Sequence, residues 1–404
     1  MMGPASPSRH GAVQLGWLWV LLWPEGIGLA CVAAIPVARC RRWAVPREIG
    51  YRMPLTAAFA VPGSLETMTG GYFYDRRLVE SLRLSGHEIQ VITLPEGFPD
   101  PGPEAMASAL SQLWVLPADQ PVIVDGLAFG AMPTQEVALI VAPIIALVHH
   151  PLALETGLDP DLAARLRGRE QDNLRLARQV IVPSPHTKAV LVSEYGVPEG
   201  KVTVLLPGID RVPRGAMALA QPPLILSVGI LHPRKGHDVL IAALARLSDL
   251  DWQAVIVGNQ WDTGHVADLQ RMIAQSDLAG RIRLVGAVDS VERDRFYAEA
   301  AVFALATRYE GYGIVFNEAL VHGLPIVTCR TGAVPDTVPA AAGLLVGVDD
   351  PDAFALALRQ LLESTPLRAQ MAAAALSAGA ALPGWDDVAR RAAAVLARCV
   401  GTAE

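Results

Sequence analysis

The chain has 404 residues, enough for two domains that each bury a hydrophobic core. Its composition, with 52% hydrophobic and 18% charged residues, is that of a folded protein and excludes long disordered stretches. The formal net charge of −7, without any dense run of Lys or Arg, argues against a nucleic-acid partner, which needs a basic surface. We therefore expect a packed, enzyme-like protein, and any phosphate that it binds should belong to a small molecule.

An apolar N-terminal extension covers residues 1–52. Residues 11–38 are almost wholly apolar, and three arginines follow within residues 39–42. This stretch is close to the length of a membrane span, but Pro24 and Glu25 interrupt its centre. A carboxylate is costly in lipid and Pro weakens a helix, so the pattern alone does not decide whether the segment spans.

Three explanations of the extension stay open. Residues 11–38 can associate with a membrane as an anchor, and the positive-inside rule then places the following body in the cytoplasm. The start can instead be mis-assigned, with translation beginning at Met53 directly before the first expected strand. A secretory signal ranks third, because only Arg9 and His10 form its basic region. The first two explanations make the body cytoplasmic, either free or held at the inner face of the membrane.

Short apolar runs alternate with segments of helical periodicity along the body, which is the signature of β–α units and a parallel sheet. The first six expected strands are 55–61, 89–94, 122–125, 144–148, 180–182 and 202–205. The second six are 224–228, 254–257, 282–285, 302–306, 326–329 and 344–346. Two sets of six strands predict an α/β protein with two doubly wound domains.

A linker is expected between the two sets of strands. Residues 207–223 contain four prolines and two glycines and show no sustained periodicity. We therefore expect an N-terminal domain over residues 53–215 and a second domain over residues 216–385. Residues 386–404 form a C-terminal segment, expected to be helical over 386–400, whose packing partner the sequence does not identify.

Paired glycines and a histidine follow expected strands of the first domain. Gly70 and Gly71 precede a helix expected from Tyr72, where paired glycines let the backbone approach a ligand and a helix N-terminus offers N–H groups to an anion. His149 ends a strand, where an imidazole can exchange a proton near neutral pH. Taken singly, the glycines fit tight packing equally well, and a lone His is more often structural.

Two adjacent cations follow the first expected strand of the second domain. Gly229 begins the loop, and Arg234 and Lys235 end it before a helix. The Arg guanidinium can grip a diphosphate as a fork and the Lys ammonium as a point charge. A solvated basic turn is the alternative, but the carboxyl edge of a parallel sheet favours ligand binding.

Two glutamates flank the start of another expected helix. Glu310 lies in the loop with Gly311 and Gly313, and Glu318 lies one to two turns into a helix that begins at Ile314. A phosphate can lie on the exposed N–H groups of this helix while the carboxylates accept hydrogen bonds from sugar or ribose hydroxyls. A capped helix with two surface glutamates is the alternative.

Signals for metal or cofactor chemistry are missing from the sequence. The four cysteines have no metal-ligand spacing, and a chain of this length needs no disulfides. No P-loop and no nucleophile elbow occur. The acidic runs at residues 159–161 and 349–352 are expected to cap helices, since Asp and Pro belong at helix starts. We therefore expect no metal and no cofactor.

Five of these features occur in the order found in one known family. The body, from Met53 to about Arg398, resembles retaining glycosyltransferases of the GT-B fold, glycosyltransferase family 4. The matching features are Gly70-Gly71, His149, the Gly229 to Gly236 segment, Glu310 to Glu318, and the loop Gly332-Ala333-Val334. The resemblance implies two Rossmann-like domains that face a cleft, with the acceptor bound by the first and the donor by the second.

The resemblance also implies residues for the donor diphosphate. Lys235 would bind it directly, and Gly71 would offer its backbone N–H. The loop of Gly332, Ala333 and Val334 would line the diphosphate and the sugar. Gly70, Gly229 and Gly313 would complete the donor site.

Further roles concern the sugar and the nucleotide. Glu310 would contact hydroxyls of the transferred sugar, His149 would lie against that sugar, and Glu318 would hold the ribose. One position departs from the family, because Ile230 stands where members usually have Arg. We expect Arg234 to supply the missing cation.

The function implied is transfer of a sugar from a nucleotide-diphosphate sugar to an unidentified acceptor, which can be a glycan, a lipid-linked molecule or a small molecule. Such enzymes retain the anomeric configuration by front-face displacement, in which the leaving phosphate takes the acceptor proton. Cationic and N–H groups can stabilise that phosphate without a metal. The alternatives are a sugar-nucleotide epimerase or phosphorylase of the same architecture, and a non-catalytic nucleotide-sugar-binding relative.

Overall fold

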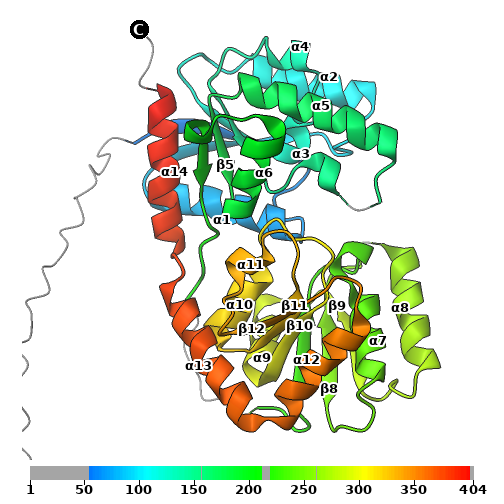
Figure 1. The fold of residues 1–404 in the computed structure, drawn as a ribbon. Coiled ribbons are helices and arrows are strands. Elements are labelled where there is room, and N and C mark those ends of the chain that lie inside the picture. Colours follow the sequence, from blue (N-terminus) through cyan, green and yellow to red (C-terminus); the bar gives the residue numbers. More distant parts are fainter. Residues whose placement is uncertain (1–53, 156, 212–218, 261, 401–404) are drawn as a thin grey trace, which may run out of the picture. The chain divides into compact units, whose positions relative to one another are not determined.

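The computed structural model describes residues 54–155, 157–211, 219–260 and 262–400. Within them the chain forms two six-stranded sheets (Figure 1). The strand order is β2-β1-β3-β4-β5-β6 in the first sheet and β12-β11-β10-β7-β8-β9 in the second. Neighbouring strands pair in parallel throughout both sheets. The predicted class, two doubly wound Rossmann-like domains, is confirmed.

All twelve predicted strands are present. The first sheet contains β1 (Thr56–Pro62), β2 (Glu88–Leu94), β3 (Val122–Asp125), β4 (Ile144–Leu147), β5 (Gln179–Val182) and β6 (Val202–Val204). The second contains β7 (Leu224–Val228), β8 (Gln253–Val257), β9 (Ile282–Gly286), β10 (Ala300–Leu305), β11 (Ile326–Cys329) and β12 (Gly343–Val346). The largest difference is in β10, which begins at Ala300 rather than at residue 302.

Helices cover both faces of each sheet, which is why the strands are apolar runs rather than alternating patterns. In β1, for example, Ala57, Phe59 and Val61 pack in the core on one face of the sheet. Ala58 and Ala60 pack in a second core on the other face. Successive side chains of a strand point to opposite faces, so this single strand contributes to two cores.

The first domain contains helices α1 (Gly70–Leu84), α2 (Pro103–Trp114), α3 (Gly126–Phe129), α4 (Thr134–Val137), α5 (Pro160–Leu176) and α6 (Pro185–Tyr195). The later helices are α7 (His237–Ala245), α8 (Thr263–Gln275), α9 (Ser290–Glu299), α10 (Ile314–His322), α11 (Val334–Thr337), α12 (Pro351–Glu363), α13 (Thr365–Ala381) and α14 (Trp385–Val400). Asp159 caps α5 and Asp350 caps α12, which confirms that both acidic runs are helix starts.

Helix α1 begins two residues earlier than predicted. Thr69 is extended at φ −131° and accepts a hydrogen bond from the Tyr72 backbone, so Thr69 is the N-cap. Gly70 and Gly71 therefore form the first turn of the helix and do not lie in the preceding loop. Glycine is a weak helix former, and the sequence alone did not reveal that a well-placed Thr would cap it.

The C-terminal helix packs on the first domain, which the sequence left open. Helix α14, red in Figure 1, packs against α1. The Trp385 ring makes edge contacts with Phe73 and Tyr74 at centroid distances of 6.2 and 5.8 Å. The chain thus crosses from the second domain back to the first, and the two are joined by more than the linker.

Some predictions fall on residues that the structure does not describe. The expected domain boundary near residue 215 lies in the interval 212–218, between the end of β6 and the start of β7. The apolar stretch 11–38 also lies outside the described residues, and the membrane anchor stays a prediction. Among the helices that are described, none is both long enough and apolar enough to cross a membrane.

Candidate donor and acceptor site

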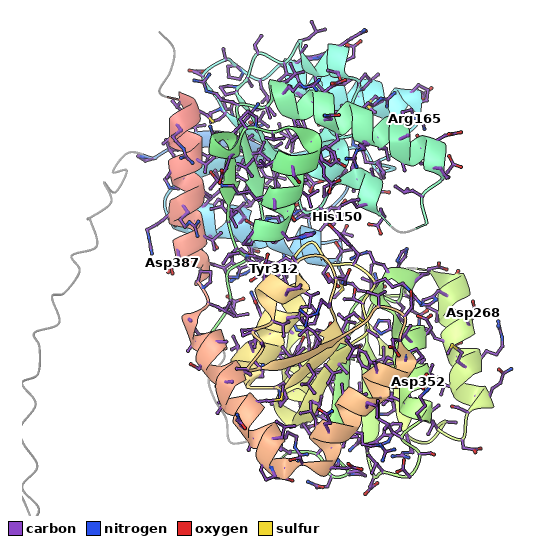
Figure 2. The ribbon with its side chains drawn as sticks, viewed as in Figure 1. His150, Arg165, Asp268, Tyr312, Asp352 and Asp387 are labelled. Carbon is purple, nitrogen blue, oxygen red and sulfur yellow. The ribbon has the colours of Figure 1, made fainter. Side chains whose placement is uncertain are left out.

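A cavity of about 730 Å³ lies at the carboxyl ends of the strands of both sheets. Both domains line it, and Figure 2 shows the labelled His150 and Tyr312 on its two sides. Eight of the predicted site residues line this cavity: Gly70, Gly71, His149, Gly229, Arg234, Lys235, Glu310 and Gly313. The remaining four, Glu318, Gly332, Ala333 and Val334, lie outside its lining.

Lys235 and Glu310 form an ion pair at the cavity. Lys235 ends the 3-10 turn Pro233–Lys235 after β7, and its Nζ lies 2.5 Å from Glu310 Oε1. Thr307 Oγ1 donates a hydrogen bond of 3.1 Å to the same oxygen. Burial lowers the pKa of Lys235 by more than Glu310 raises it. Burial raises the pKa of Glu310, but Lys235 and Arg234 lower it by more, so the carboxylate is charged at neutral pH.

Two glycines allow the loops to meet around Glu310. Gly236 follows Lys235 at φ 64°, and a Cβ there would lie 1.9 Å from the Ala306 carbonyl oxygen. Gly332 has φ 49°, and a Cβ there would lie 2.3 Å from the Glu310 carbonyl oxygen. The Ala333 N–H donates to that same oxygen over 2.9 Å. Gly332 and Ala333 thus hold the backbone of Glu310, although they do not line the cavity.

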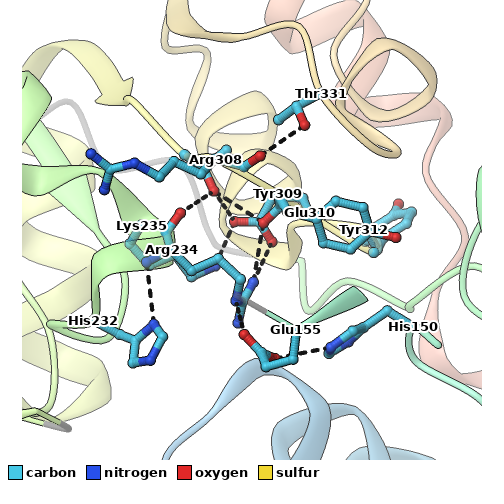
Figure 3. Close-up of polar contacts among 12 residues, drawn as sticks. His150, Glu155, His232, Arg234, Lys235, Arg308, Tyr309, Glu310, Tyr312 and Thr331 are labelled. Atoms are coloured by element: carbon cyan, nitrogen blue, oxygen red, sulfur yellow. Dashed lines mark hydrogen bonds and ion pairs between the residues drawn. The ribbon is translucent and has the colours of Figure 1, made fainter. Parts of the chain in front are cut away.

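Arg234 connects the two domains. Its Nη1 donates to the Tyr309 carbonyl oxygen over 3.1 Å and lies 3.9 Å from Glu310 Oε2. Its Nε lies 3.2 Å from Glu155 Oε1, in the loop after β4 of the first domain. His150 Nε2 lies 3.0 Å from the other oxygen of Glu155, so that Glu155 stands between Arg234 and His150 (Figure 3).

The departure at Ile230 leaves the cavity wall apolar at that position, because Ile230 lines the cavity. Arg234 and Lys235 both reach Glu310, so two cations stand side by side four and five residues further along the chain. This geometry is what compensation by Arg234 requires, and the compensation stays a prediction.

The loop that carries Glu310 is fixed by Arg308. Its Nη2 donates to Asp238 Oδ2 over 2.7 Å and its Nε to Asp349 Oδ1 over 2.8 Å. Its Nη1 donates to the carbonyl oxygen of Pro233, at the start of the turn that ends in Lys235. The Thr331 hydroxyl donates to the Arg308 carbonyl oxygen over 2.9 Å (Figure 3). No role for Arg308 was predicted from the sequence. Its position two residues before Glu310 was the only available signal.

His149 is held by two buried carboxyl groups. Its Nε2 donates to Asp75 Oδ1 over 2.9 Å and lies 3.6 Å from Asp125 Oδ2. A Cβ on Gly71 would come within 3.4 Å of the His149 ring, so the first turn of α1 lies against the imidazole. Burial alone would lower the pKa of His149, but Asp75 and then Asp125 raise it above its ordinary value. Burial, with Asp75 adding to it, raises the pKa of Asp125 to about 7.

Asp75 and Asp125 were not recognised in the sequence. Asp75 lies within α1, where a single Asp is typical of a solvated helix face, yet it is 1% exposed. Asp125 is the last residue of β3, at the same sheet edge as His149. Its place at a strand end was a usable signal, because carboxyl ends of parallel strands meet at one edge.

Asp75, Asp125 and His149 also offer three potential metal-ligand atoms within 4.8 Å of one another. No metal site was predicted, because the sequence has no Cys/His cluster with metal-ligand spacing and these three residues are far apart in the chain. One His with two carboxylates is a ligand set that several divalent metals accept. The ligand atoms of Asp75 and His149 are the ones already joined by a hydrogen bond, so an ion-paired triad explains the same geometry.

Glu318 lies on α10 and is satisfied by neighbouring side chains. Tyr297 Oη donates to it over 2.8 Å, and Arg293 Nη1 lies 3.5 Å away. Its side chain is 13% exposed, and burial raises the pKa of its carboxyl. Val334, at the start of α11, is fully buried in the core of the second domain.

Two family models match the chain. "Glycosyltransferase Family 4" matches residues 74–212, and "Glycosyl transferases group 1" matches residues 216–377. Curated relatives include a D-inositol 3-phosphate glycosyltransferase of Nocardioides sp., 30% identical over 264 residues, with 59% of this chain and 57% of the relative covered. Another, of Xylanimonas cellulosilytica, is 31% identical and covers 59% of this chain and 60% of the relative. The chain thus spans about three fifths of the length of these relatives.

Solved structures share the fold at low sequence identity. Sucrose-phosphate synthase from Thermosynechococcus elongatus has a TM-score of 0.73 and 20% identity, over 85% of this chain and 98% of that one. Anabaena Alr3699/HepE in complex with UDP and glucose has a TM-score of 0.68 and 16% identity, over 85% and 99% of the two chains. The two family models cover the two sheet-bearing halves in turn, and the chain belongs to glycosyltransferase family 4, with the two-domain GT-B fold.

Proposed function

We propose that this protein is a retaining glycosyltransferase that moves a sugar from a nucleotide-diphosphate sugar to a hydroxyl group of an acceptor. One observation carries the proposal: Arg234 and Lys235 stand beside the Glu310 carboxylate in a cavity at the carboxyl edge of the second sheet. Two cations suit a diphosphate, and a carboxylate suits the hydroxyls of a sugar. The relatives' names and the UDP complex of one structural neighbour support this assignment.

Donor binding would rearrange the ion pairs that line the cavity. Lys235 and Arg234 are paired with glutamates, Glu310 and Glu155, which are the groups that a diphosphate replaces. Glu310 is then released to accept hydrogen bonds from the sugar. The N-terminus of α10 adds a helix dipole, since Gly313 and Ile314 line the same cavity.

The chemistry asks the protein for charge stabilisation rather than for a nucleophile. The bond between the anomeric carbon and the phosphate oxygen breaks, and a bond to the acceptor oxygen forms on the same face of the sugar. The acceptor proton passes to the leaving phosphate. Preorganised cations and N–H groups stabilise the negative charge that develops on the diphosphate, so no metal is required.

The alternatives are not favoured. The printed names of the matching relatives are those of glycosyltransferases, and none of those reported above is an epimerase. A non-catalytic relative that binds the same donor would also keep Lys235 and Arg234, so measured sugar transfer separates it from the proposed enzyme. Three points are parts of the proposal: that this chain catalyses the transfer, which acceptor it uses, and where in the cell it acts.

A thermal-shift panel of UDP, GDP, ADP and TDP sugars tests the donor site. A ligand at 100 times its Kd stabilises the folded state by about 2.7 kcal/mol, which a melting curve resolves. We expect one nucleotide to produce this shift and Lys235→Gln to reduce it. Lys188→Gln is the matched control, because Lys188 lies on α6 outside the cavity lining and forms an ion pair with Glu199. If no nucleotide shifts the melting temperature, the proposed function is wrong.

A further inference from the structure

The wall that the first domain contributes to the cavity is acidic. Its acidic residues are Glu96, Asp125 and Glu155, and His149 and His150 line it as well. Among the described residues that line the cavity, the Lys and Arg side chains are Arg234 and Lys235, and both belong to the second domain. The wall of the first domain therefore offers carboxyl groups and no Lys or Arg side chain among its described lining residues.

Glu96 and Tyr72 form the outer part of this wall. Tyr72 Oη donates to the Pro62 carbonyl oxygen over 2.7 Å, which holds the ring against the end of β1. A Cβ on Gly63 would lie 3.4 Å from Glu96 Cγ, so the glutamate stem runs beside Gly63. Burial raises the pKa of Tyr72, and the negative charges of Asp125, Asp75 and Glu96 raise it further.

Glu96 is available to a ligand. It is exposed, and among the described residues it has no hydrogen-bond or ion-pair partner. Apolar side chains line the same cavity, among them Phe98 and Leu127. A free carboxylate beside apolar surface fits a molecule that has hydroxyl groups on its edge and C–H groups on its face, as sugars and cyclic polyols have.

We propose that the acceptor is an uncharged polyhydroxylated molecule, and that Glu96 accepts hydrogen bonds from its hydroxyls. This inference rests on the proposed function and specifies the substrate class of the same cavity. A phosphate or carboxylate on the acceptor would face the Glu96 carboxylate, while Lys235 and Arg234 are engaged by the donor diphosphate. The acceptor therefore differs in charge from the phosphorylated inositol in the names of the curated relatives.

Matched acceptor pairs test this inference. The full-length protein is supplied with the nucleotide sugar that gave the largest thermal shift, and product formation is followed by mass spectrometry. The pairs are myo-inositol with D-inositol 3-phosphate, glucose with glucose 6-phosphate, and mannose with mannose 6-phosphate. We expect at least a tenfold higher kcat/KM for the neutral member of each pair that reacts. Higher kcat/KM for the phosphorylated members, or reaction with none of the neutral ones, overturns the inference.

Variants of Glu96 give a second readout. Glu96→Gln should raise KM for the neutral acceptor about tenfold while leaving the nucleotide-induced thermal shift as in the wild type. Glu96→Lys should shift the preference toward the phosphorylated member by at least tenfold. Glu104→Gln, an exposed glutamate of α2 outside the cavity lining, is the control. Unchanged acceptor kinetics in both Glu96 variants would contradict the assignment of Glu96. A missing nucleotide shift in the wild type would instead contradict the proposed function.

Discussion

Glu155 and Arg234 form an ion pair, at 3.2 Å between Oε1 and Nε, that joins the loop after β4 to the turn after β7. The two residues belong to different domains. Glu155 is also 3.0 Å from His150, so one carboxylate holds a histidine of the first domain and a donor-side cation of the second. In the proposed function, the donor diphosphate and Glu155 compete for Arg234.

Substitution Glu155→Gln should tighten nucleotide binding about fivefold, because it removes the carboxylate that the diphosphate displaces. The size corresponds to about 1 kcal/mol, typical of a partly exposed ion pair. Isothermal titration with the nucleotide found in the thermal-shift panel measures it, with Glu199→Gln as control, since Glu199 pairs with Lys188 elsewhere. Weaker binding by Glu155→Gln would mean that Glu155 positions Arg234 instead of competing for it.

Lys235 has a structural and a binding role that can be separated. Lys235→Met alone leaves the Glu310 carboxylate buried without its closest partner and should cost about 3 kcal/mol of unfolding free energy. The double variant Lys235→Met with Glu310→Gln removes both charges and should restore stability to within about 1 kcal/mol of the wild type.

Urea denaturation and nucleotide titration are measured on both variants. We expect the double variant to regain stability and still to lack nucleotide binding, because the diphosphate needs the cation itself. Nucleotide binding that returned with stability would show that Lys235 only supports the loop.

Asp125 predicts a pH dependence of stability. The pKa of this carboxyl is about 7 in the folded protein against about 3.9 in an unfolded chain, so the folded state holds the proton more tightly. The stabilisation of the folded state by the Asp125 proton is thus fully present below about pH 4 and is lost as the pH rises through about 7.

Asp125→Asn keeps an oxygen that can accept the Leu127 N–H, which the carboxylate now accepts over 2.8 Å, and it does not ionise. Between pH 5 and pH 8, the unfolding free energy of the wild type should fall by about 2 kcal/mol relative to that of this variant. Urea unfolding at several pH values measures the difference. Parallel curves for the two proteins would contradict the raised pKa.

The strands could be predicted because both sheets are covered on both faces, so each strand is an apolar run that ends at a turn. Helix α1 was predicted to begin two residues too late because its start depends on the Thr69 cap. The sequence Gly70-Gly71 after Thr69 favours a loop, since glycine is a weak helix former. The packing of α14 on α1 depends on the ring contacts of Trp385 with residues about 310 positions earlier, and no local pattern encodes such a contact.

The candidate site was predictable where its residues follow strands, as His149, Lys235 and Glu310 do. The residues that hold them were not predictable. Asp75 is buried inside a helix, and Glu155 acquires its meaning only when the other domain brings Arg234 to it. A contact between two domains has no sequence spacing to reveal it.

Glu318 separates a binding role from a structural one. If its carboxylate holds the ribose, Glu318→Gln should weaken nucleotide binding about tenfold, the loss expected for a hydrogen bond to a charged group. Tyr297→Phe is the matched control, because it removes the hydrogen bond of 2.8 Å to Glu318 but leaves the carboxylate. Nucleotide titrations and melting curves of both variants distinguish the two roles. If Glu318→Gln and Tyr297→Phe lose the same stability and both keep the wild-type nucleotide affinity, Glu318 is a packing residue of α10.

We expect sugar transfer to be independent of metal ions, and the triad of Asp75, Asp125 and His149 is where this expectation can be tested. Sugar transfer after treatment with EDTA should proceed at the untreated rate. Added Mg²⁺ or Mn²⁺ should change that rate by less than about twofold. The reason is that Lys235 and Arg234 neutralise the leaving diphosphate. If EDTA abolishes transfer and a divalent ion restores it, the triad is the place to look, since its ligand atoms lie within 4.8 Å of one another. In that case Asp75→Asn would weaken metal binding in a direct titration. In a metal-free enzyme, Asp75→Asn lowers turnover because it releases His149, and EDTA does not change the transfer rate of the variant.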